Sequence, residues 1–269
     1  MATARRVVDR FNAVDGGLLA AGLAYNAVLA LIPIALVVTA LAGFVLNDPD
    51  SRTRFIEAVV TFAPPLTGVV DEIVRGLSKA STSLSVIGLV LAFWGASRLF
   101  ASLESGVGQM FSGAPHRGFI SRTIRRVGAI AVLAFILAAA LIAIPILSVA
   151  GDMIRAAGAV ESLFLTLAFV AIAFVLAAVA LAALFRVLPP LMPTWRQIRT
   201  PAVVTAAALL VITRGFTLIA PRLFGANVIY GTLGAIFLGL AWLDLLFTAI
   251  LIGAAWVAIR SANEEAAVV

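Results

Sequence analysis

The chain has 269 residues, of which 63% are hydrophobic and only 12% are charged. Soluble globular chains are nearer half apolar and about a quarter charged. This sequence has too few polar side chains to cover a folded surface in water, so its mean hydropathy of +1.14 indicates an integral membrane protein. It contains no cysteine and one histidine, which excludes disulfides, thiolate metal sites and multi-histidine centres.

Six apolar stretches are long enough to cross a hydrocarbon layer about 30 Å thick, which needs roughly 20 helical residues. They are apolar around the whole helical period, as lipid-embedded helices are. The predicted spans are residues 18–46, 84–107, 127–150, 162–188, 201–220 and 230–259. The sequence therefore predicts an all-α, polytopic membrane protein of six transmembrane helices, with residues 1–269 forming a single transmembrane domain.

The segment 47–83 is the longest one outside the predicted spans, and it is not simply polar. Leu66, Ile73 and Leu77 recur at helical spacing, with charged residues on the rest of the wheel. This pattern predicts amphipathic helices on the outer side of the membrane. Two roles are open for them: a gate for a substrate, or a lid that only packs.

Basic residues gather in alternate loops. The N-terminus, the loops 108–126 and 186–200, and Arg260 hold eleven Lys and Arg residues, and the loops of the opposite side hold six. A net charge of +6 would suggest nucleic acid in a soluble protein. In a membrane protein the same charge follows the positive-inside rule, which predicts that both termini are cytoplasmic.

Four ionisable residues fall within the predicted spans: Arg98, Glu104, Arg214 and Asp244. Such a residue costs about 2.5–3.5 kcal/mol on insertion scales, so it normally faces the bundle interior and has a partner. Arg98 and Asp244 lie at equal depth, roughly 21 Å below the outer boundary, which predicts an ion pair. That pair would either fix helix register or belong to a transport path. Arg214, about 9 Å from the outer end of its span, is a weaker candidate that we expect to snorkel to the interface.

Polar side chains also form a stripe on the second predicted span. Arg98, Ser102, Ser105 and Gln109 follow one another at helical spacing, and Asn26 of the first span is expected at a depth similar to that of Glu104. A stripe of this kind lines a wet cavity or bonds neighbouring helices. The candidate residues of a substrate path are therefore Arg98, Asp244, Ser102, Ser105, Gln109, Asn26 and Glu104.

No known catalytic motif occurs in the sequence. It has no phosphate-cradling glycine loop with its lysine, no HExxH, no GxSxG and no carboxylate cluster suited to two metal ions. We therefore expect no catalytic residue, no metal and no cofactor. Gly231, Ala235 and Gly239 form a ridge of small residues that permits close helix approach, so a protein partner or a second copy could dock there. Glu264 and Glu265 are expected only to solvate a polar tail.

Several motifs resemble those of the YihY family, also called the virulence factor BrkB family, of bacterial inner-membrane proteins. They are AAGLAYNAVLALIP (20–33), WGASRLF (94–100), LFRVLP (184–189) and IYGTLGAIFLGLAWL (229–243), and the resemblance runs from about residue 17 to 259. Arg98 matches the basic residue after the Trp-x-Ala-Ser motif, and Tyr230 with Gly231 matches the Tyr-Gly pair of the last span. The chain departs from the family in having Asn26 in place of a second aromatic residue. It also has Ala255 where an acidic residue is usual, which puts proton coupling in doubt.

The resemblance implies a multi-pass protein of the bacterial inner membrane with a role in the cell envelope. Membrane lipids are its expected partners, and the leading hypothesis is that it moves a lipid or lipid-like amphiphile across or out of the membrane. The alternatives are a non-catalytic scaffold or assembly factor and, third, a solute or ion transporter, for which the sequence lacks a convincing internal duplication. The family's former label, ribonuclease BN, does not suit this sequence because it has no base, metal site or aromatic platform for RNA, so we expect no nucleic-acid partner.

Overall fold

A computed structural model of the protein describes residues 2–45, 83–111, 159–224 and 231–266. All regular structure within these ranges is helical. The helices are α1 (Ala2–Asn12), α2 (Gly16–Val45), α5 (Ser83–Met110), α7 (Ala159–Val187), α8 (Trp195–Phe224) and α9 (Gly231–Ala266). Helices α2, α5, α7, α8 and α9 overlap five of the six predicted spans, although α8 begins six residues earlier than predicted. The remaining predicted span, 127–150, and the predicted outer segment 47–83, apart from Ser83, lie outside the described residues.

Three described helices are long and apolar enough to cross a membrane. These candidate spans are Thr166–Val187, Trp195–Ile219 and Ile236–Glu264. A fourth candidate is the pair Ala4–Asn12 and Gly16–Ala30, if the two segments, which meet at 67°, form one broken span. The described residues thus support a helical membrane protein with three to four candidate spans, and the number six stays a prediction.

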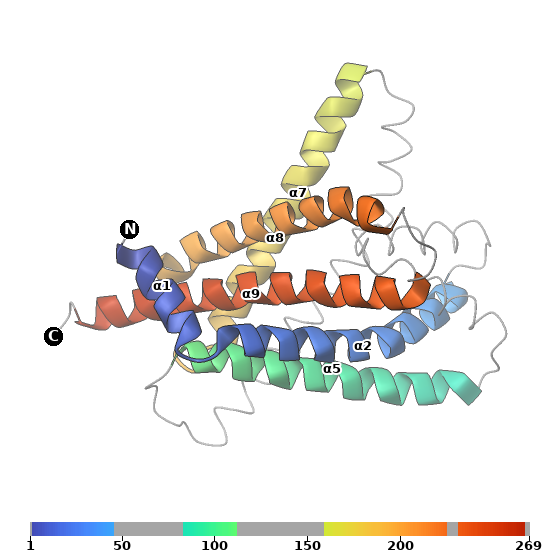
Figure 1. The fold of residues 1–269 in the computed structure, drawn as a ribbon, viewed down its shortest axis with the longest axis horizontal. Helices are drawn as coiled ribbons and strands as arrows, with labels where there is room; N and C mark the ends of the chain where they lie inside the picture. The colour runs from blue at the N-terminus through green and yellow to red at the C-terminus, as the bar shows by residue number, and fades with distance from the viewer. Residues whose placement is uncertain (1, 46–82, 112–158, 225–230, 267–269) are drawn as a thin grey trace.

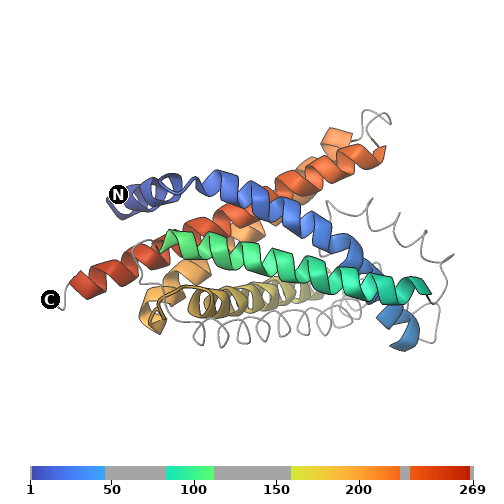
Figure 2. The ribbon, with the colours of Figure 1, turned by 90° about the horizontal axis from the view of Figure 1, so that it is seen from below.

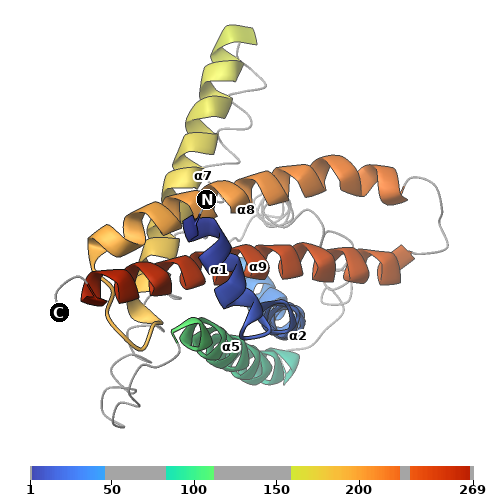
Figure 3. The same ribbon diagram turned by 60° about the vertical axis from the view of Figure 1, so that its left-hand side comes forward.

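Helix α1 is an element that the sequence analysis did not predict. It crosses the end of the bundle (Figure 3) and buries Val7 in the core, where Phe11 also packs. The turn into α2 has Asp15 in the left-handed region, at φ 52°. A Cβ at Gly16 would lie 2.7 Å from Cγ of Phe11, so glycine lets α2 begin directly beneath that ring. The signal for α1 was the i, i+4 spacing of Val7 and Phe11 among charged residues.

Helices α2 and α5 lie side by side and antiparallel (Figure 2). They approach so closely that a Cβ at Gly95 would lie 3.0 Å from the Cα of Ala30. Helix α9 packs against both of them and against α8, whereas α7 packs mainly on α8 and diverges from the bundle toward its N-terminal end (Figure 1). Close packing therefore concentrates where α7, α8 and α9 cross, and along the α2–α5 pair.

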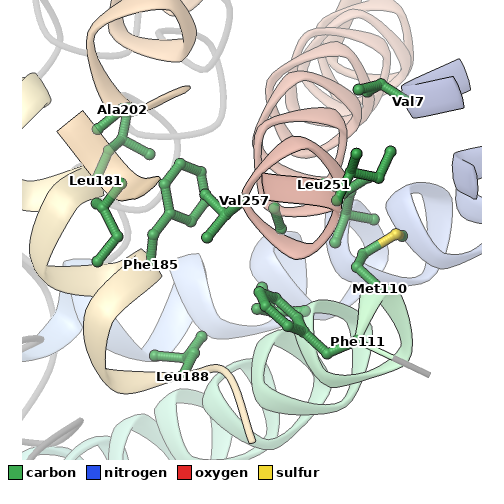
Figure 4. Packing of buried hydrophobic residues seen from close by; sticks show 14 of the residues in the cluster. Val7, Met110, Phe111, Leu181, Phe185, Leu188, Ala202, Leu251 and Val257 are labelled. Atoms are coloured by element: carbon green, nitrogen blue, oxygen red, sulfur yellow. The ribbon is translucent and has the colours of Figure 1, made fainter. Parts of the chain in front are cut away.

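The core at the α7–α8–α9 crossing depends on a glycine. Phe185 of α7 is fully buried and points toward Val257 of α9 (Figure 4). A Cβ on Gly253 of α9 would lie 2.8 Å from Cζ of Phe185 and would also overlap the hydroxyl oxygen of Thr205. Real Cβ atoms do not approach other atoms that closely. Gly253 thus sets how near α9 comes to its two neighbours.

Candidate functional site

Polar groups of α2 and α5 meet along a line that we call the α2–α5 seam: the Gly22 carbonyl and Asn26 of α2, and Ser102 of α5. Arg98 lies one turn before Ser102, at the exposed edge of the seam. The Asn26 side-chain amide donates to Ser102 Oγ at 2.9 Å and to the Gly22 carbonyl at 3.0 Å. Both amide hydrogens are thereby used. The Asn26 Oδ1 atom is buried and has no hydrogen-bond partner. The seam therefore contains an acceptor with unused capacity, and a buried acceptor normally has a donor.

Arg98 does not form the predicted ion pair with Asp244 within the described part of the chain. Its side chain is exposed and its guanidinium lies over the Trp94 ring, 5.2 Å from the ring centroid. Because Trp94 and Arg98 are one turn apart on α5, they share the outward face of that helix. Asp244 is half-buried on α9. Arg98 is thus held by an aromatic ring on its own helix, and its charge has no carboxylate partner among these residues.

The predicted stripe on α5 lies at the edge of the contact with α2. Ser105 and Gln109 are exposed like Arg98, and Gln109 Nε2 donates to Ser105 Oγ at 3.4 Å. Ser102 is half-buried because it faces α2 and accepts the Asn26 bond. Glu104 is half-buried and points away from the stripe, about 120° around the helix from Arg98. The stripe is therefore partly a contact between helices and partly an outward polar surface, and both interpretations of the sequence apply to some of its residues.

The C-terminal end of α5 is capped by α1. Arg10 donates from Nε to the Met110 carbonyl at 2.9 Å and from Nη2 to the Gln109 carbonyl at 3.0 Å. The last carbonyls of a helix have no intrahelical donor, and a cation near them is favourable. Arg10 was counted only as a topological charge in the sequence analysis. Its residue type and helical phase gave no signal for this distant contact.

A second polar group, which we call the Gln197 cluster, joins the start of α8 to the end of α9. Gln197 is 5% exposed, and its Oε1 accepts from the Thr194 backbone N–H at 2.7 Å and from Ser261 Oγ at 3.2 Å. Its Nε2 donates to Glu264 Oε2 at 2.6 Å. Thr194 and Gln197 have the spacing of a capping box, which explains why α8 begins at Trp195 and not near residue 201.

The Gln197 cluster corrects two expectations from the sequence: the role of Glu264 and the residue at which α8 begins. Glu264 does more than solvate a tail, since it accepts a hydrogen bond from a buried amide. The Thr194-x-x-Gln197 pattern could have revealed the helix start from the sequence, but the contact with α9 could not, because the two partners lie far apart in the chain. The Gln197 cluster is thus a junction between two candidate spans.

Basic residues gather at this end of the molecule. Arg186 donates to the Pro193 carbonyl and lies over the Trp195 ring at 5.7 Å from its centroid. The N-terminal helix, the C-terminal ends of α5, α7 and α9 and the start of α8 meet at the same end (Figures 1 and 2). The described basic residues there are Arg5, Arg6, Arg10, Arg186, Arg196, Arg199 and Arg260. The described segments that the sequence predicts on one side of the membrane therefore lie together, whereas residues 112–126 of that predicted side lie outside the described residues.

The remaining candidate residues lie apart from the seam. Arg214 is exposed on α8. Gly239 of the small-residue ridge is buried within the bundle, and the surroundings of Gly231 and Ala235 lie outside the described residues. The indole Nε1 of Trp242 on α9 is a second buried polar atom without a partner. Among the described residues no three His, Asp or Glu side chains come together in a way that could hold a metal ion.

The long apolar helices in the described part of the chain define a helical membrane protein. The chain belongs to the Virulence factor BrkB family, whose sequence profile matches residues 7–268, and the resemblance to the YihY/BrkB proteins is thus confirmed. A UPF0761 membrane protein of Chromohalobacter salexigens is 25% identical over 97% of this chain and 64% of its own length.

A second relative is an uncharacterized protein of Dickeya dadantii, 31% identical over 38% of this chain and 32% of its own length. The chain thus spans less than two thirds of the length of each of these relatives. No solved structure matches the chain.

Proposed function

We propose that the protein moves a lipid or lipid-like amphiphile between the leaflets of the bacterial inner membrane or out of it. The observation that carries this proposal is the exposed guanidinium of Arg98 near the middle of α5. From Ser83, Arg98 lies about 22 Å along a helix about 42 Å long. A mid-helix cation on an outward face is unusual for a helix that crosses hydrocarbon.

A cation on this face of α5 is costly in free energy, so an anionic ligand that neutralises Arg98 would be favourable. A charged group in hydrocarbon needs a partner or water, and Trp94 supplies only a cation–π contact, worth about 0.5–2 kcal/mol. A lipid phosphate would complete the neutralisation through charge-assisted hydrogen bonds. The headgroup would then follow the α2–α5 seam while its acyl chains stay in the bilayer.

The outward polar residues extend this path toward the basic end. Ser105 and Gln109 continue from Arg98 along the exposed face of α5, and Glu104 and Asp244 lie half-buried on α5 and α9. We assign these residues to a substrate path. Arg214 remains a weaker candidate because it stands on α8.

The inner-membrane location and the topology are part of the same proposal. Both chain ends lie toward the basic end of the bundle (Figures 1 and 2), and basic segments face the cytoplasm. Both termini are therefore assigned to the cytoplasmic side. We propose no enzymatic step, cofactor or nucleic-acid partner, so lipid movement would be downhill, ion-coupled or driven by another protein.

Leaflet exchange of fluorescent phospholipids in liposomes tests this function. We compare the wild type, Arg98→Ala and Asp244→Asn with Arg196→Ala, which removes an exposed arginine at the start of α8. We expect exchange by the wild type and by Arg196→Ala, and a loss of about tenfold or more in Arg98→Ala, since bonds to charged groups contribute about 1.5–3 kcal/mol. Absence of exchange by the wild type, or equal exchange by Arg98→Ala, contradicts the proposal.

A non-catalytic scaffold or assembly factor is the second candidate function. The observation that favours it is the apolar surface of α7, where Leu163, Leu167 and Ile172 are more than half exposed on a helix that diverges from the bundle (Figure 1). A stable complex recovered in mild detergent from cells, together with no lipid exchange, would support the scaffold and contradict the first proposal.

A further inference from the structure

Helix α1 is held in a fixed direction at the basic end of the bundle. Asp15 turns the chain in the left-handed region, and Gly16 leaves room for the Phe11 ring above the start of α2. The two helices meet at 67°. Arg10 also donates to the last carbonyls of α5. Buried packing and hydrogen bonds therefore set the angle of α1, which is not a frayed chain end.

The level of α1 relative to the membrane follows from α5, which we place across the membrane as its sequence predicts. Helix α5 has 28 residues and is about 42 Å long, about the thickness of a bilayer with its headgroup regions. Arg10 contacts Gln109 and Met110 at the end of α5. Helix α1 thus lies at the level of the lipid headgroups, and its bend turns its axis toward the membrane plane.

The two faces of α1 differ in chemistry. Val7 is buried and points toward α9 (Figure 4), and Phe11 packs on the same core. Helix α9 continues past α1 to Ala266 (Figure 1), so α1 lies on its side. Arg5 and Arg6 are exposed and form no hydrogen bond or ion pair within the described part of the chain. Two cations therefore stand on the outward side of a helix whose inner side is packed.

Exposed apolar side chains accompany these arginines. Val8 of α1 is 49% exposed, and Leu18, just after the turn into α2, is 76% exposed. Trp195 at the same end of the molecule is also exposed, and tryptophan is enriched where a membrane meets water. A soluble anion would neutralise the arginines but leave the apolar side chains in water. A lipid surface accommodates both, with acyl chains against the apolar groups and phosphates against the cations.

We propose that α1 is an interfacial helix that binds anionic phospholipids of the cytoplasmic leaflet, with Arg5 and Arg6 each contacting a separate phosphate group. The inference rests on the cytoplasmic topology proposed above and requires no lipid movement. Charge-assisted hydrogen bonds from the guanidinium groups hold the phosphates. Because Arg10 of the same helix caps α5, anionic lipid at α1 also stabilises the contact between α1 and α5.

A single introduced cysteine tests the position of α1, because the chain has no cysteine of its own. The full-length protein carries a fluorophore at Val8→Cys or, as the control, at Val211→Cys, which is exposed on α8 about 24 Å after Trp195. The vesicles contain phosphatidylcholine and phosphatidylglycerol, with nitroxide quenchers in the headgroup or in the middle of the acyl chain. We expect the headgroup quencher to act more strongly at position 8 and the acyl-chain quencher at position 211. Stronger acyl-chain quenching at position 8, or no quenching there, would overturn the inference.

Lipid binding tests the two arginines. Phosphatidylglycerol and phosphatidylcholine with identical acyl chains are added to the protein in detergent micelles, and bound lipid is counted by native mass spectrometry. We expect the wild type to prefer phosphatidylglycerol, and each of Arg5→Gln and Arg6→Gln to reduce that preference about fivefold, the ratio for one cation near an anionic surface. Lysine at both positions should retain the preference. Asn12→Gln, an uncharged and exposed position on α1, should bind like the wild type.

Three results would overturn the inference: no preference in the wild type, a preference that persists when both arginines are replaced by glutamine, or an equal loss in Asn12→Gln. Displacement of phosphatidylglycerol by inorganic phosphate at constant ionic strength would identify a soluble anion as the ligand and would also overturn it. Absence of leaflet exchange together with this lipid preference would contradict the proposed function and leave the role of α1 standing. Exchange without the preference would do the reverse.

Discussion

The Gln197 cluster and the α2–α5 seam are both polar groups between helices, and they differ in how fully they are bonded. In the cluster, the buried Gln197 amide uses its oxygen and its nitrogen, and it joins the start of α8 to the end of α9. In the seam, Asn26 Oδ1 is unused, and Arg98 at its edge is exposed. Fully bonded groups stabilise a fold, whereas an unpaired buried polar atom is costly.

The helices around the Gln197 cluster are also packed more closely than those beside the α2–α5 seam. Near the Gln197 cluster, Gly253 lies in a crossing so close that an added methyl group has no room. Beside the seam, Gly22 faces open space. The first region holds three helices together, whereas the second is less closely packed at Gly22 and leaves Asn26 Oδ1 without a partner.

Gly253→Ala should have the largest effect on stability. The new methyl group would overlap Phe185 and Thr205, and overpacking of this kind costs up to about 3 kcal/mol, which outweighs the gain of about 1 kcal/mol in helix propensity. The measurement is the free energy of unfolding in mixed micelles titrated with a denaturing detergent. Gly215→Ala is the control, since its Cβ would meet nothing within 4 Å, and it should be neutral or stabilising. Equal effects of the two substitutions would contradict the tight crossing.

Gln197→Leu should have the next largest effect on stability. It removes the capping bond to Thr194 and the bonds to Ser261 and Glu264, with an expected loss of about 2 kcal/mol in the same unfolding assay. The matched control is Gln109→Leu, whose exposed bond to Ser105 is 3.4 Å long and should contribute little. A comparable loss in both variants would show that the Gln197 cluster is no more structural than the outward surface of α5.

Ser102→Ala should have the smallest effect on stability. Asn26 keeps its bond to the Gly22 carbonyl, so the expected loss is about 0.5–1 kcal/mol. The substitution sharpens the comparison because it should alter lipid exchange while leaving the unfolding transition nearly unchanged. If Ser102→Ala destabilised the protein as much as Gln197→Leu, the seam would be a structural junction like the cluster.

Most of the described helices could be located from the sequence because the signal for a helix is local. Helices α2, α7 and α9 lie close to the predicted spans, since a long apolar run needs no partner to be recognised. Helix α1 was missed because it is short and charged. The start of α8 was placed too late because the Thr194-x-x-Gln197 box was not used.

The candidate site was predicted less completely. Asn26 and Ser102 were named and are in contact, but Arg98 and Asp244 were expected to pair from equal depth alone. Depth along a helix says nothing about the direction of a side chain around it. Arg98 points outward and lies over the Trp94 ring. Trp94 belongs to the WGASRLF motif, but it was not predicted to be a partner of Arg98.

By itself, the sequence determined that this chain is a helical membrane protein of the BrkB family, and it located most of the described helices and the polar stripe on α5. Composition and periodicity suffice for that, because each helix satisfies its own backbone hydrogen bonds wherever it stands. Only the tertiary structure decided which polar atoms meet, since that depends on the rotation and approach of helices distant in the chain. Gln197 and Asn26 both place a side-chain amide between helices. The oxygen of Gln197 is hydrogen-bonded and that of Asn26 is not, and only the residues around each amide make this difference.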